Sequence, residues 1–419
     1  MAVTMHDDLL FINYFPYFLS QHGVWDVYGF FGNHFIRQVG YTYYPPGVYY
    51  LTAIGQWLFQ NLNSNFVLVI ERYHHFYYNA LPIAEADLFS GLSILQMMGL
   101  AFWTKAPYLI LEAGIAALIA QTFCSSREAV DKALRLWFMS PIVIFSVYVM
   151  GQHRLYTTFF IWGALWAMRR GKTKFVWLSM AGACLCDSIS WVLIPPALIV
   201  FGREKYQRLQ FLFWGVIPIA LALIPLAFSS SGFVTTAYYA PLLQKQTMQG
   251  IFRHSIPGMP QALKILLAAS YIFILALLEK KEHSLSRQDE DATLDFATAC
   301  LAILFTLYAT TSTVIHYFMW AMPFAVLVAL DKPDKNSIYF GAIIALLFIF
   351  NLDSRRLNLG LLTPLGPSFW MAQPSWHEWV QAWLPWWGSL IATARLGFSV
   401  LCLWKAWHLV RNRFVSVNS

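Results

Sequence analysis

The chain has 419 residues, of which 58% are hydrophobic and only 12% are charged, and its mean hydropathy is +0.53. A soluble domain carries about a quarter charged residues, so this composition excludes an ordinary soluble protein. The net charge of +7 does not indicate a nucleic-acid partner, because membrane proteins accumulate lysine and arginine in their cytoplasmic loops. We expect an all-α, polytopic transmembrane helical bundle that forms a single transmembrane domain over residues 1–419.

Residues 1–45 are predicted to form an outer-face segment that carries an acidic motif. Asp7 and Asp8 precede an apolar, aromatic run from Leu9 to Leu19, which would dock on the membrane and hold both carboxylates near it. Because neighbouring carboxylates disfavour each other's ionisation, one of them is suited to accept a proton. Asp26 follows in the same segment. A solvated N-terminal tail is the alternative.

A diproline comes next, in the stretch Tyr44-Pro45-Pro46. Each proline ring fixes φ and removes a hydrogen-bond donor, so the pair stops a helix and rigidifies the backbone. At the mouth of a membrane helix this predicts a shaped pocket. Alternatively, Pro46 simply begins a helix at its first position.

Apolar segments of membrane-spanning length recur along the rest of the chain and predict about 11 spans. Residues 46–330 would form the bundle core, and residues 331–419 the C-terminal spans with a Trp-rich outer loop at 353–386, which suits an interfacial helix. We place the spans at residues 46–62, 88–104, 106–124, 136–150, 154–168, 209–229, 262–279, 294–311, 314–330, 336–352 and 387–409.

The stretch 175–200 is expected to be a broken hairpin that enters and leaves on one side. It is apolar, but Asp187-Ser188 and Pro195-Pro196 interrupt it. Irregular backbone at membrane depth is tolerated only where protein buries it or it lines a cavity.

The basic clusters set the expected orientation. With these spans, the clusters fall on one face, which the positive-inside bias makes cytoplasmic. They comprise Arg127, Lys132, Arg135, Arg169, Arg170, Lys172, Lys174, Arg203, Lys205, Arg208, Lys280, Lys281, Arg287, Lys332, Lys335, Arg411 and Arg413. The protein is therefore expected to be a multi-pass protein of the cell membrane, with its site on the non-cytoplasmic side.

Polar residues at the outer ends of the spans are the candidates for binding a substrate. Gln152 and His153 occupy a turn between two spans, and His316 and Tyr317 lie near the outer end of another. Lys245, Arg253 and His254, in the loop 230–261, are candidates for a phosphate group. Ordinary capping turns and a solvated loop are the alternatives.

The sequence contains no nucleotide-binding fingerprint, so an enzyme of this kind needs an activated substrate delivered through the lipid phase. Five scattered cysteines do not form a metal-binding pattern. No cofactor is firmly predicted, and a divalent cation is not supported by any motif.

In their order along the chain, these elements resemble the GT-C superfamily of integral-membrane glycosyltransferases, and most closely its bacterial polyprenyl-phosphate-sugar and mannosyltransferase-like members. The resemblance covers most of residues 6–330. Its motifs are His6-Asp7-Asp8-Leu9-Leu10, Tyr44-Pro45-Pro46, Lys105-Ala106-Pro107-Tyr108-Leu109, Ser140-Pro141, Gly151-Gln152, Pro195-Pro196 and the segment from His316-Tyr317 to Met322-Pro323.

The chain departs from the family pattern at a few positions. An acid usually follows Gly-Gln, whereas His153-Arg154 follow here; a lysine often lies in the broken hairpin, whereas Asp187-Ser188 stand there. The acid expected after the Lys-x-Pro-Tyr-Leu segment is matched by Glu112. The family's first span precedes the acidic motif, so we expect that a span is missing here or that the start codon is assigned too late.

The resemblance implies transfer of a sugar from a polyprenyl-phosphate-linked donor to a hydroxyl of a lipid or glycan acceptor, with inversion and a carboxylate general base. Asp7 or Asp8 would be the base, with Asp26 as the next candidate. Tyr44, Pro45, Pro46, Lys105 and the polar residues above would bind substrate in a cavity open laterally to lipid. A multi-pass transporter or lipid flippase is the main alternative, because discontinuous helices also build transport sites; a membrane scaffold is the third.

The expected topology is testable by cysteine accessibility. Single cysteines at Ser231 and Arg169, in a background without the five native cysteines, should be labelled from opposite sides of the membrane. Labelling of both positions by an impermeant reagent added to one side would contradict the topology.

Overall fold

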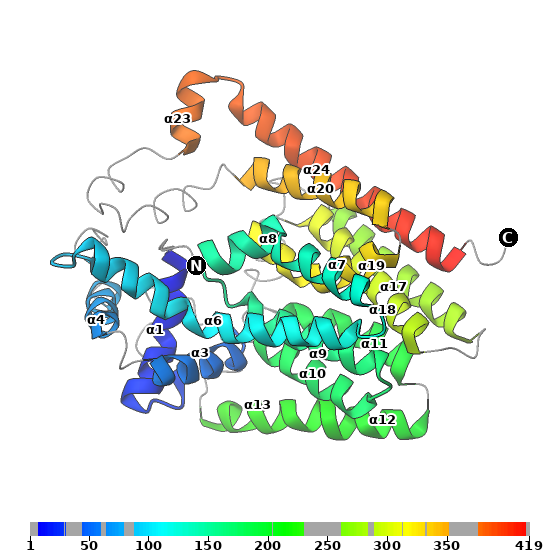
Figure 1. Ribbon diagram of the computed structural model, residues 1–419, viewed down its shortest axis with the longest axis horizontal. Coiled ribbons are helices and arrows are strands. Elements are labelled where there is room, and N and C mark those ends of the chain that lie inside the picture. Colours follow the sequence, from blue (N-terminus) through cyan, green and yellow to red (C-terminus); the bar gives the residue numbers. More distant parts are fainter. Residues whose placement is uncertain are drawn as a thin grey trace.

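A computed structural model of the chain describes residues 7–28, 30, 44–59, 64–78, 88–202, 204–229, 261–283, 289–311, 313–331, 333–351 and 376–415. These residues form α-, 3-10 and π-helices joined by short turns, and no β-strand occurs among them. The prediction of an all-α protein is therefore confirmed for the described part. Its long helices run mostly along the longest axis of the molecule, whereas the first helix crosses one end of the bundle (Figure 1).

The described helices are, in chain order, α1 (Asp7–His22), α3 (Pro46–Phe59), α4 (Ser64–Tyr78), α6 (Ile94–Thr122), α7 (Arg127–Phe138), α8 (Pro141–Val143), the π-helix η2 (Ile144–Val149), α9 (Arg154–Arg169), α10 (Thr173–Cys186), the 3-10 helix η3 (Ser188–Leu193), α11 (Ile194–Phe201), α12 (Lys205–Phe211), the π-helix η4 (Leu212–Val216), α13 (Ile217–Ser229), α17 (Gln261–His283), α18 (Asp289–Thr310), the 3-10 helix η6 (Ile315–Trp320), α19 (Met322–Asp331), α20 (Pro333–Asn351), α23 (Trp376–Trp383), α24 (Trp387–Val410) and the π-helix η8 (Arg411–Val415).

Four segments in the described part are long and apolar enough to cross a membrane: Ile94–Thr122, Lys205–Ile224, Glu290–Thr310 and Trp387–Val415. A fifth results if Arg127–Phe138 and Pro141–Val149, which are bent by 45°, form one broken span. These helices are features of a membrane protein. The expected number of about 11 spans exceeds the four or five that length and composition identify among the described residues.

The prediction of two spans at residues 88–104 and 106–124 is wrong, because the single helix α6 runs through both segments. Lys105, which separated them in the sequence, is fully buried. Its Nζ donates hydrogen bonds to the backbone oxygens of Tyr148 (3.1 Å) and Val149 (2.9 Å), and Pro107 lies inside the helix. A lysine whose charge is met by carbonyl oxygens inside the bundle does not require a loop.

The predicted break in the stretch 175–200 is present. The helix α10 ends at Cys186, and the Asp187 side chain accepts a hydrogen bond from the backbone N–H of Ile189 at the start of η3. Near the start of α10, the ring of Trp177 lies 4.9 Å from that of Phe211, at the end of α12. That the stretch enters and leaves on one side of a membrane stays a prediction.

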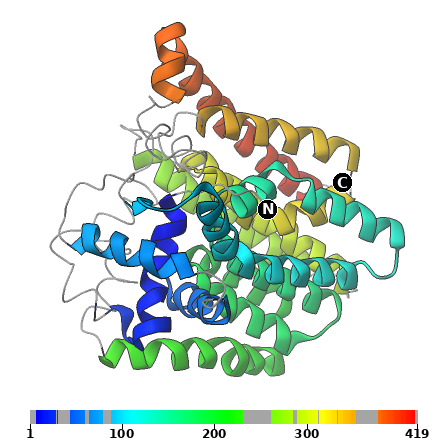
Figure 2. The same ribbon diagram turned by 60° about the vertical axis from the view of Figure 1, so that its left-hand side comes forward.

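Burial separates central from peripheral helices. In the apolar window of Glu290–Thr310, 89% of the residues are buried, against 11% for Lys205–Ile224 and 22% for Trp387–Val415. Accordingly, α18 occupies the interior, and α12–α13 and α24 lie on opposite sides of the bundle in both views (Figures 1 and 2). The exposed faces of the outer helices remain apolar, as lipid contact requires.

Several of the predicted basic clusters meet at one end of the bundle. Arg169, at the end of α9, pairs with Glu290 of α18. Buried Asp295 of α18 accepts hydrogen bonds from Lys281 of α17 (2.9 Å) and from Arg413 of η8. This basic end joins the termini of four helices; which side of a membrane it faces stays a prediction.

Packing between α3 and α10 gives a stability prediction. A Cβ added to Gly47 would lie 2.6 Å from the backbone oxygen of Leu185, so Gly47→Ala should force the two helices apart and cost about 1–3 kcal/mol of unfolding free energy. Gly99→Ala is the control, because nothing lies within 4 Å of the added Cβ; it should stabilise the helix by about 0.5–1 kcal/mol. Thermal unfolding in detergent measures both, and equal melting temperatures would contradict this account of the contact.

Candidate functional site

Most of the predicted site residues that the structure describes lie around the turn Gly151–His153, which joins η2 to α9. The far end of α9, at Arg169, belongs to the basic end described above. Since an α-helix rises about 1.5 Å per residue, the turn lies roughly 22 Å from that end. The candidate site and the basic clusters therefore occupy opposite ends of α9.

Glycine is required at position 151 for two reasons. Its φ is +69°, in the left-handed region that favours glycine. A Cβ there would lie 2.9 Å from Cδ1 of Leu9 and 3.2 Å from Cε of Lys105. The turn is thus pressed between the beginning of α1, whose first turn contains Asp7 and Asp8, and the middle of α6.

A buried ion pair follows the turn. Arg154, the first residue of α9, donates through Nη1 to Oδ2 of Asp187 at the break between α10 and η3, and the two side chains are only 8% and 5% exposed. The same carboxylate oxygen accepts a hydrogen bond from Nε1 of Trp320, at 3.0 Å. The interaction ties three segments together: the start of α9, the broken hairpin and η6.

Aromatic rings surround the Arg154 guanidinium. Its central carbon lies 4.9 Å from the ring centroids of both Tyr317 and Trp320, and 5.7 Å from that of Tyr44. The rings of Tyr317 and Trp320 are stacked, with an interplanar angle of 8°. Cation–π attraction is strongest where water is excluded, so this cage helps to offset the desolvation of the arginine.

The diproline stretch positions Tyr44 in this cage. Pro46 is the first residue of α3, a position that suits proline because the missing N–H has no helical partner. The backbone oxygen of Tyr44 accepts a hydrogen bond from the Tyr28 hydroxyl (2.6 Å), and its N–H donates to the Tyr49 hydroxyl (3.3 Å). The alternative interpretation of the sequence is therefore confirmed, because Pro46 begins a helix; the shaped pocket at the diproline stays a prediction.

His153 is one of the buried polar side chains at the candidate site whose hydrogen bonding is incomplete among the described residues. It is fully buried, its ring lies 4.1 Å from that of Tyr44, and neither ring nitrogen has a hydrogen-bond partner among the described residues. Burial, the charge of Arg154 and the neighbouring His316 hold the pKa of His153 well below its ordinary value. The ring is therefore neutral, with one donor and one acceptor available to a hydroxyl or a phosphate ester.

The structure brings several predicted residues together. Gln152 and His316 are buried near His153, and the ring of His316 packs edge-on against Tyr317 at 4.7 Å. Pro45 and Pro46 lie beside Tyr44 at the start of α3. The backbones of Asp7 and Asp8 form the first turn of α1, next to the Gly151 turn.

Other predicted residues are placed elsewhere or not described. Asp26 lies just after α1, next to Trp25, whose backbone oxygen accepts a hydrogen bond from the Tyr50 hydroxyl of α3 (3.1 Å). The side chains of Asp7 and Asp8, and the three cations Lys245, Arg253 and His254, lie outside the described residues.

Sequence reasoning missed Arg154, Asp187 and Trp320 as parts of the site. Arg154 and Asp187 stood out only as departures from the family pattern, one in the turn and one in the hairpin. Their opposite charges in two apolar neighbourhoods were the signal that could have paired them, because a buried charge requires a partner.

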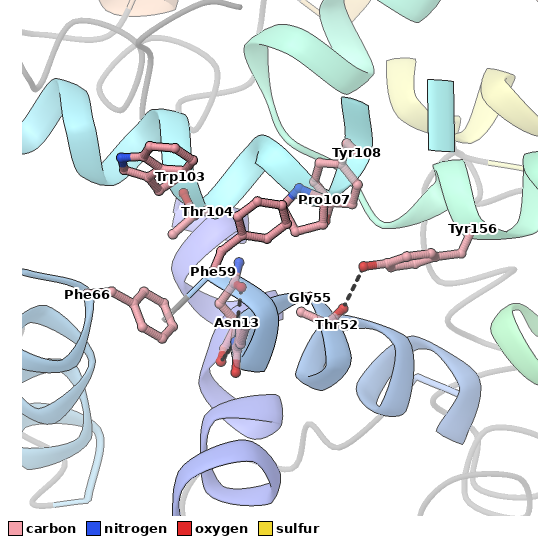
Figure 3. Close-up of a pocket in the computed structure, with 11 residues that line it drawn as sticks. Asn13, Thr52, Gly55, Phe59, Phe66, Trp103, Thr104, Pro107, Tyr108 and Tyr156 are labelled. Carbon is pink, nitrogen blue, oxygen red and sulfur yellow. Dashed lines mark hydrogen bonds between the residues drawn. The ribbon is translucent and has the colours of Figure 1, made fainter. Parts of the chain in front are cut away.

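A small cavity lies beside the site, between α1, α3 and α6 (Figure 3). Its volume is about 20 Å³, room for about one water molecule. The side chain of Gln56 donates to Oδ1 of Asn13 (3.0 Å) at its polar edge, and Thr52 donates to the Tyr156 hydroxyl (3.3 Å). The predicted cavity was to be lined by the stretch Tyr43–Pro46, by Gln152 and His316, and by the loop 230–261. The cavity found here has different walls: Asn13, Thr52, Gly55, Gln56, Phe59, Phe66, Trp103, Thr104, Pro107, Tyr108 and Tyr156.

No group of three or more histidine, cysteine, aspartate or glutamate side chains in the described ranges could hold a metal ion. Comparison with protein-family models, with curated proteins and with solved structures found no match to the chain.

The Arg154–Asp187 pair gives the prediction of this section. Arg154→Ala and Asp187→Ala should each cost about 3–5 kcal/mol, because each leaves an uncompensated buried charge. The exchange Arg154→Asp with Asp187→Arg should recover part of that loss, as measured by a double-mutant cycle on thermal or denaturant unfolding.

The exposed pair of Arg135 and Asp131 is the matched control. Its side chains are 71% and 59% exposed, so removing either charge should change stability little. Additive losses in the Arg154 and Asp187 variants, with no coupling, would refute the ion pair as an organising interaction.

Proposed function

We propose that the chain is a membrane glycosyltransferase of the GT-C type. It transfers a sugar from a polyprenyl-phosphate-linked donor to a hydroxyl of a glycolipid or glycan acceptor at the non-cytoplasmic face of the cell membrane, with inversion. The observation that carries the proposal is the contact between Arg154 and Asp187, because it unites two departures from the family pattern.

The family pattern has an acid soon after Gly-Gln and a lysine in the broken hairpin. This chain has a cation, Arg154, after Gly151-Gln152 and an acid, Asp187, in the hairpin, and the two are in contact. An exchange of the two charges retains the attraction between turn and hairpin. The departures therefore compensate each other and no longer count against the resemblance.

A second support is that motifs far apart in the sequence meet at one end of the bundle. The start of α1, the Tyr44-Pro45-Pro46 stretch, Lys105 and the turn at Gln152 are neighbours in space. Tyr317 of η6 joins them through the Arg154 cage. An ordered set of motifs that assembles around one position is what a shared site requires.

In the proposed mechanism, Asp7 or Asp8, with Asp26 as the next candidate, removes the proton of the acceptor hydroxyl. The hydroxyl oxygen attacks the anomeric carbon while the bond to the lipid phosphate breaks, and the phosphate leaves with the bonding electron pair. The neutral His153 ring, Gln152 and His316 would hydrogen-bond the sugar or phosphate oxygens. Lys245, Arg253 and His254 would stabilise the growing phosphate charge.

The proposal also includes the number of membrane spans and the broken hairpin. The helices Thr173–Cys186, Ser188–Phe201, Met322–Asp331 and Ile338–Asn351 are apolar but shorter than a span. Together with α3, α9 and α17 they would bring the bundle towards the 11 spans and the broken hairpin of a GT-C-like fold. A transporter would instead use the break at Asp187 as an ion site, but Arg154 and Trp320 already occupy that carboxylate.

The proposal is tested by turnover of a polyprenyl-phosphate sugar by the purified protein. Asp7→Asn or Asp8→Asn, whichever removes the base, should lower the rate about 10²–10⁴-fold while donor binding is retained. Asp131→Asn, an exposed acid at the distant α7 surface, is the control. Full activity of both single variants and of the double variant would exclude these carboxylates, and turnover of a nucleotide sugar without any lipid carrier would refute the function.

A further inference from the structure

The end of the bundle opposite the candidate site carries exposed cations that the proposed function does not use. Between residues 169 and 211 the sequence holds two acids, Asp187 and Glu204, and Asp187 is buried against Arg154 at the other end of α9. The exposed cations of this region, which we call the basic patch, are Arg170, Lys172, Lys174, Lys205 and Arg208. The patch therefore has a net positive charge.

The helices that carry the patch both begin at the basic end. The helix α10 begins at Thr173, four residues after Arg169, with which α9 ends. Phe201, the last residue of α11, packs against Phe296 of α18, with ring centroids 6.4 Å apart. Phe296 follows Asp295, the buried acid of the basic end, so α12 also begins there. In Figure 1, α12 and the C-terminus lie towards the same end.

The starts of α10 and α12 lie side by side. The ring centroids of Trp177 and Phe211 are 4.9 Å apart, and a Cβ added to Gly215 would lie 3.7 Å from Cβ of Trp177. Lys174 precedes Trp177 by three residues, and Arg208 precedes Phe211 by three, which is about one helical turn in each case. The cations of the two helices therefore belong to neighbouring turns of packed elements.

Aromatic rings lie beside two of these lysines. Nζ of Lys172 is 4.8 Å from the ring centroid of Trp166, and Nζ of Lys174 is 5.1 Å from that of Phe175. A lysine whose stem covers an aromatic ring keeps its charge at the boundary between apolar and polar surroundings. The α9–α10 turn thus presents its charges next to an apolar surface.

That apolar surface continues along α12. Tyr206, Leu209 and Phe213 are 67%, 44% and 57% exposed. They open the segment Lys205–Ile224, which is long and apolar enough to cross a membrane and is only 11% buried in its apolar window. Cations in the first turn of a lipid-exposed span lie at the height of the lipid headgroups.

Other cations of the basic end are paired with acids. Arg169 contacts Glu290, and Arg413 contacts the buried Asp295. The three lysines of the basic patch form no ion pair among the described residues. Their charge is therefore available to a partner outside the chain.

We propose that the basic patch is a docking surface for the headgroup of an anionic phospholipid, whose acyl chains lie along the exposed apolar faces of α10 and α12. The continuity of the cations with a lipid-exposed span favours a lipid over a soluble anion. Each lysine or arginine near an anionic membrane surface strengthens binding about fivefold. The inference is independent of the proposed glycosyltransferase, whose site lies at the other end of α9.

The test titrates the whole chain in detergent with phosphatidylglycerol or with phosphatidylcholine of the same acyl chains, and native mass spectrometry measures the bound lipid. The wild type should prefer phosphatidylglycerol. Lys172→Gln with Lys174→Gln should weaken its binding about 25-fold, five for each charge, and leave phosphatidylcholine unchanged. Lys205→Gln with Arg208→Gln should have a similar effect. Unchanged affinity in either pair would overturn the proposal, and should one pair not fold, the other decides.

The matched control is Arg127→Gln with Lys132→Gln. It removes two charges from α7, which packs against α6 and α19 and also carries Glu128 and Asp131. Its affinity for phosphatidylglycerol should equal that of the wild type, as should that of Lys172→Arg with Lys174→Arg. An equal loss in the α7 variant would show a general effect of net charge and refute the site.

Two further titrations separate a lipid from a soluble anion. Inorganic phosphate should not displace phosphatidylglycerol; displacement at equal concentrations would make the patch a site for soluble phosphate and refute the lipid. A higher concentration of ammonium acetate should weaken the binding of phosphatidylglycerol, because salt screens exposed charges beyond about 8 Å at physiological ionic strength. Binding that does not depend on salt would contradict the role of the cations.

Discussion

The buried contact between Arg154 and Asp187 is the interaction on which the rest of this end of the molecule depends. Two charges taken out of water are tolerated only where their hydrogen bonds are met. Nε1 of Trp320 and the backbone N–H of Ile189 donate further hydrogen bonds to the Asp187 carboxylate. The rings of Tyr44, Tyr317 and Trp320 surround the Arg154 guanidinium. The pair thereby fixes the start of α9, the break after α10 and η6 relative to one another. The close approach of Gly47 to Leu185 adds α3 to the same assembly.

Much of the fold could be predicted from the lengths of the apolar segments and from the polar residues and prolines that interrupt them. The helices α9, α18, α20 and α24 and the break at Asp187 lie where the sequence predicts them. The interfacial helix expected in the Trp-rich region has a counterpart in α23, which exposes Trp379 and Trp383. The one clear error, at α6, came from treating Lys105 as a loop residue, although carbonyl oxygens 43 and 44 positions away bind its ammonium.

Members of the candidate site could be proposed one by one from the sequence, but the contacts among them could not. Gln152, His153, His316 and Tyr317 were identified as polar residues at the outer ends of predicted spans, and Tyr44 through the diproline that follows it. The pairing of Arg154 with Asp187 was not predicted, because 33 positions separate the two residues and each alone looks like a departure from a motif. Pairing across such a distance is decided by how α9 packs on α10, which no local pattern encodes. The cage around Arg154 is likewise a product of packing among three segments.

The most direct test of the account is a cryo-electron microscopy structure of the protein in lipid nanodiscs with a polyprenyl phosphate. The account predicts Arg154 paired with Asp187, and phosphate density at the same end of α9, within reach of His153 and of the first turn of α1. Phosphate density at the opposite, basic end, beside Arg169 and Arg413, would contradict the assignment of the site. Separation of Arg154 from Asp187 in that structure would contradict the interaction that organises it.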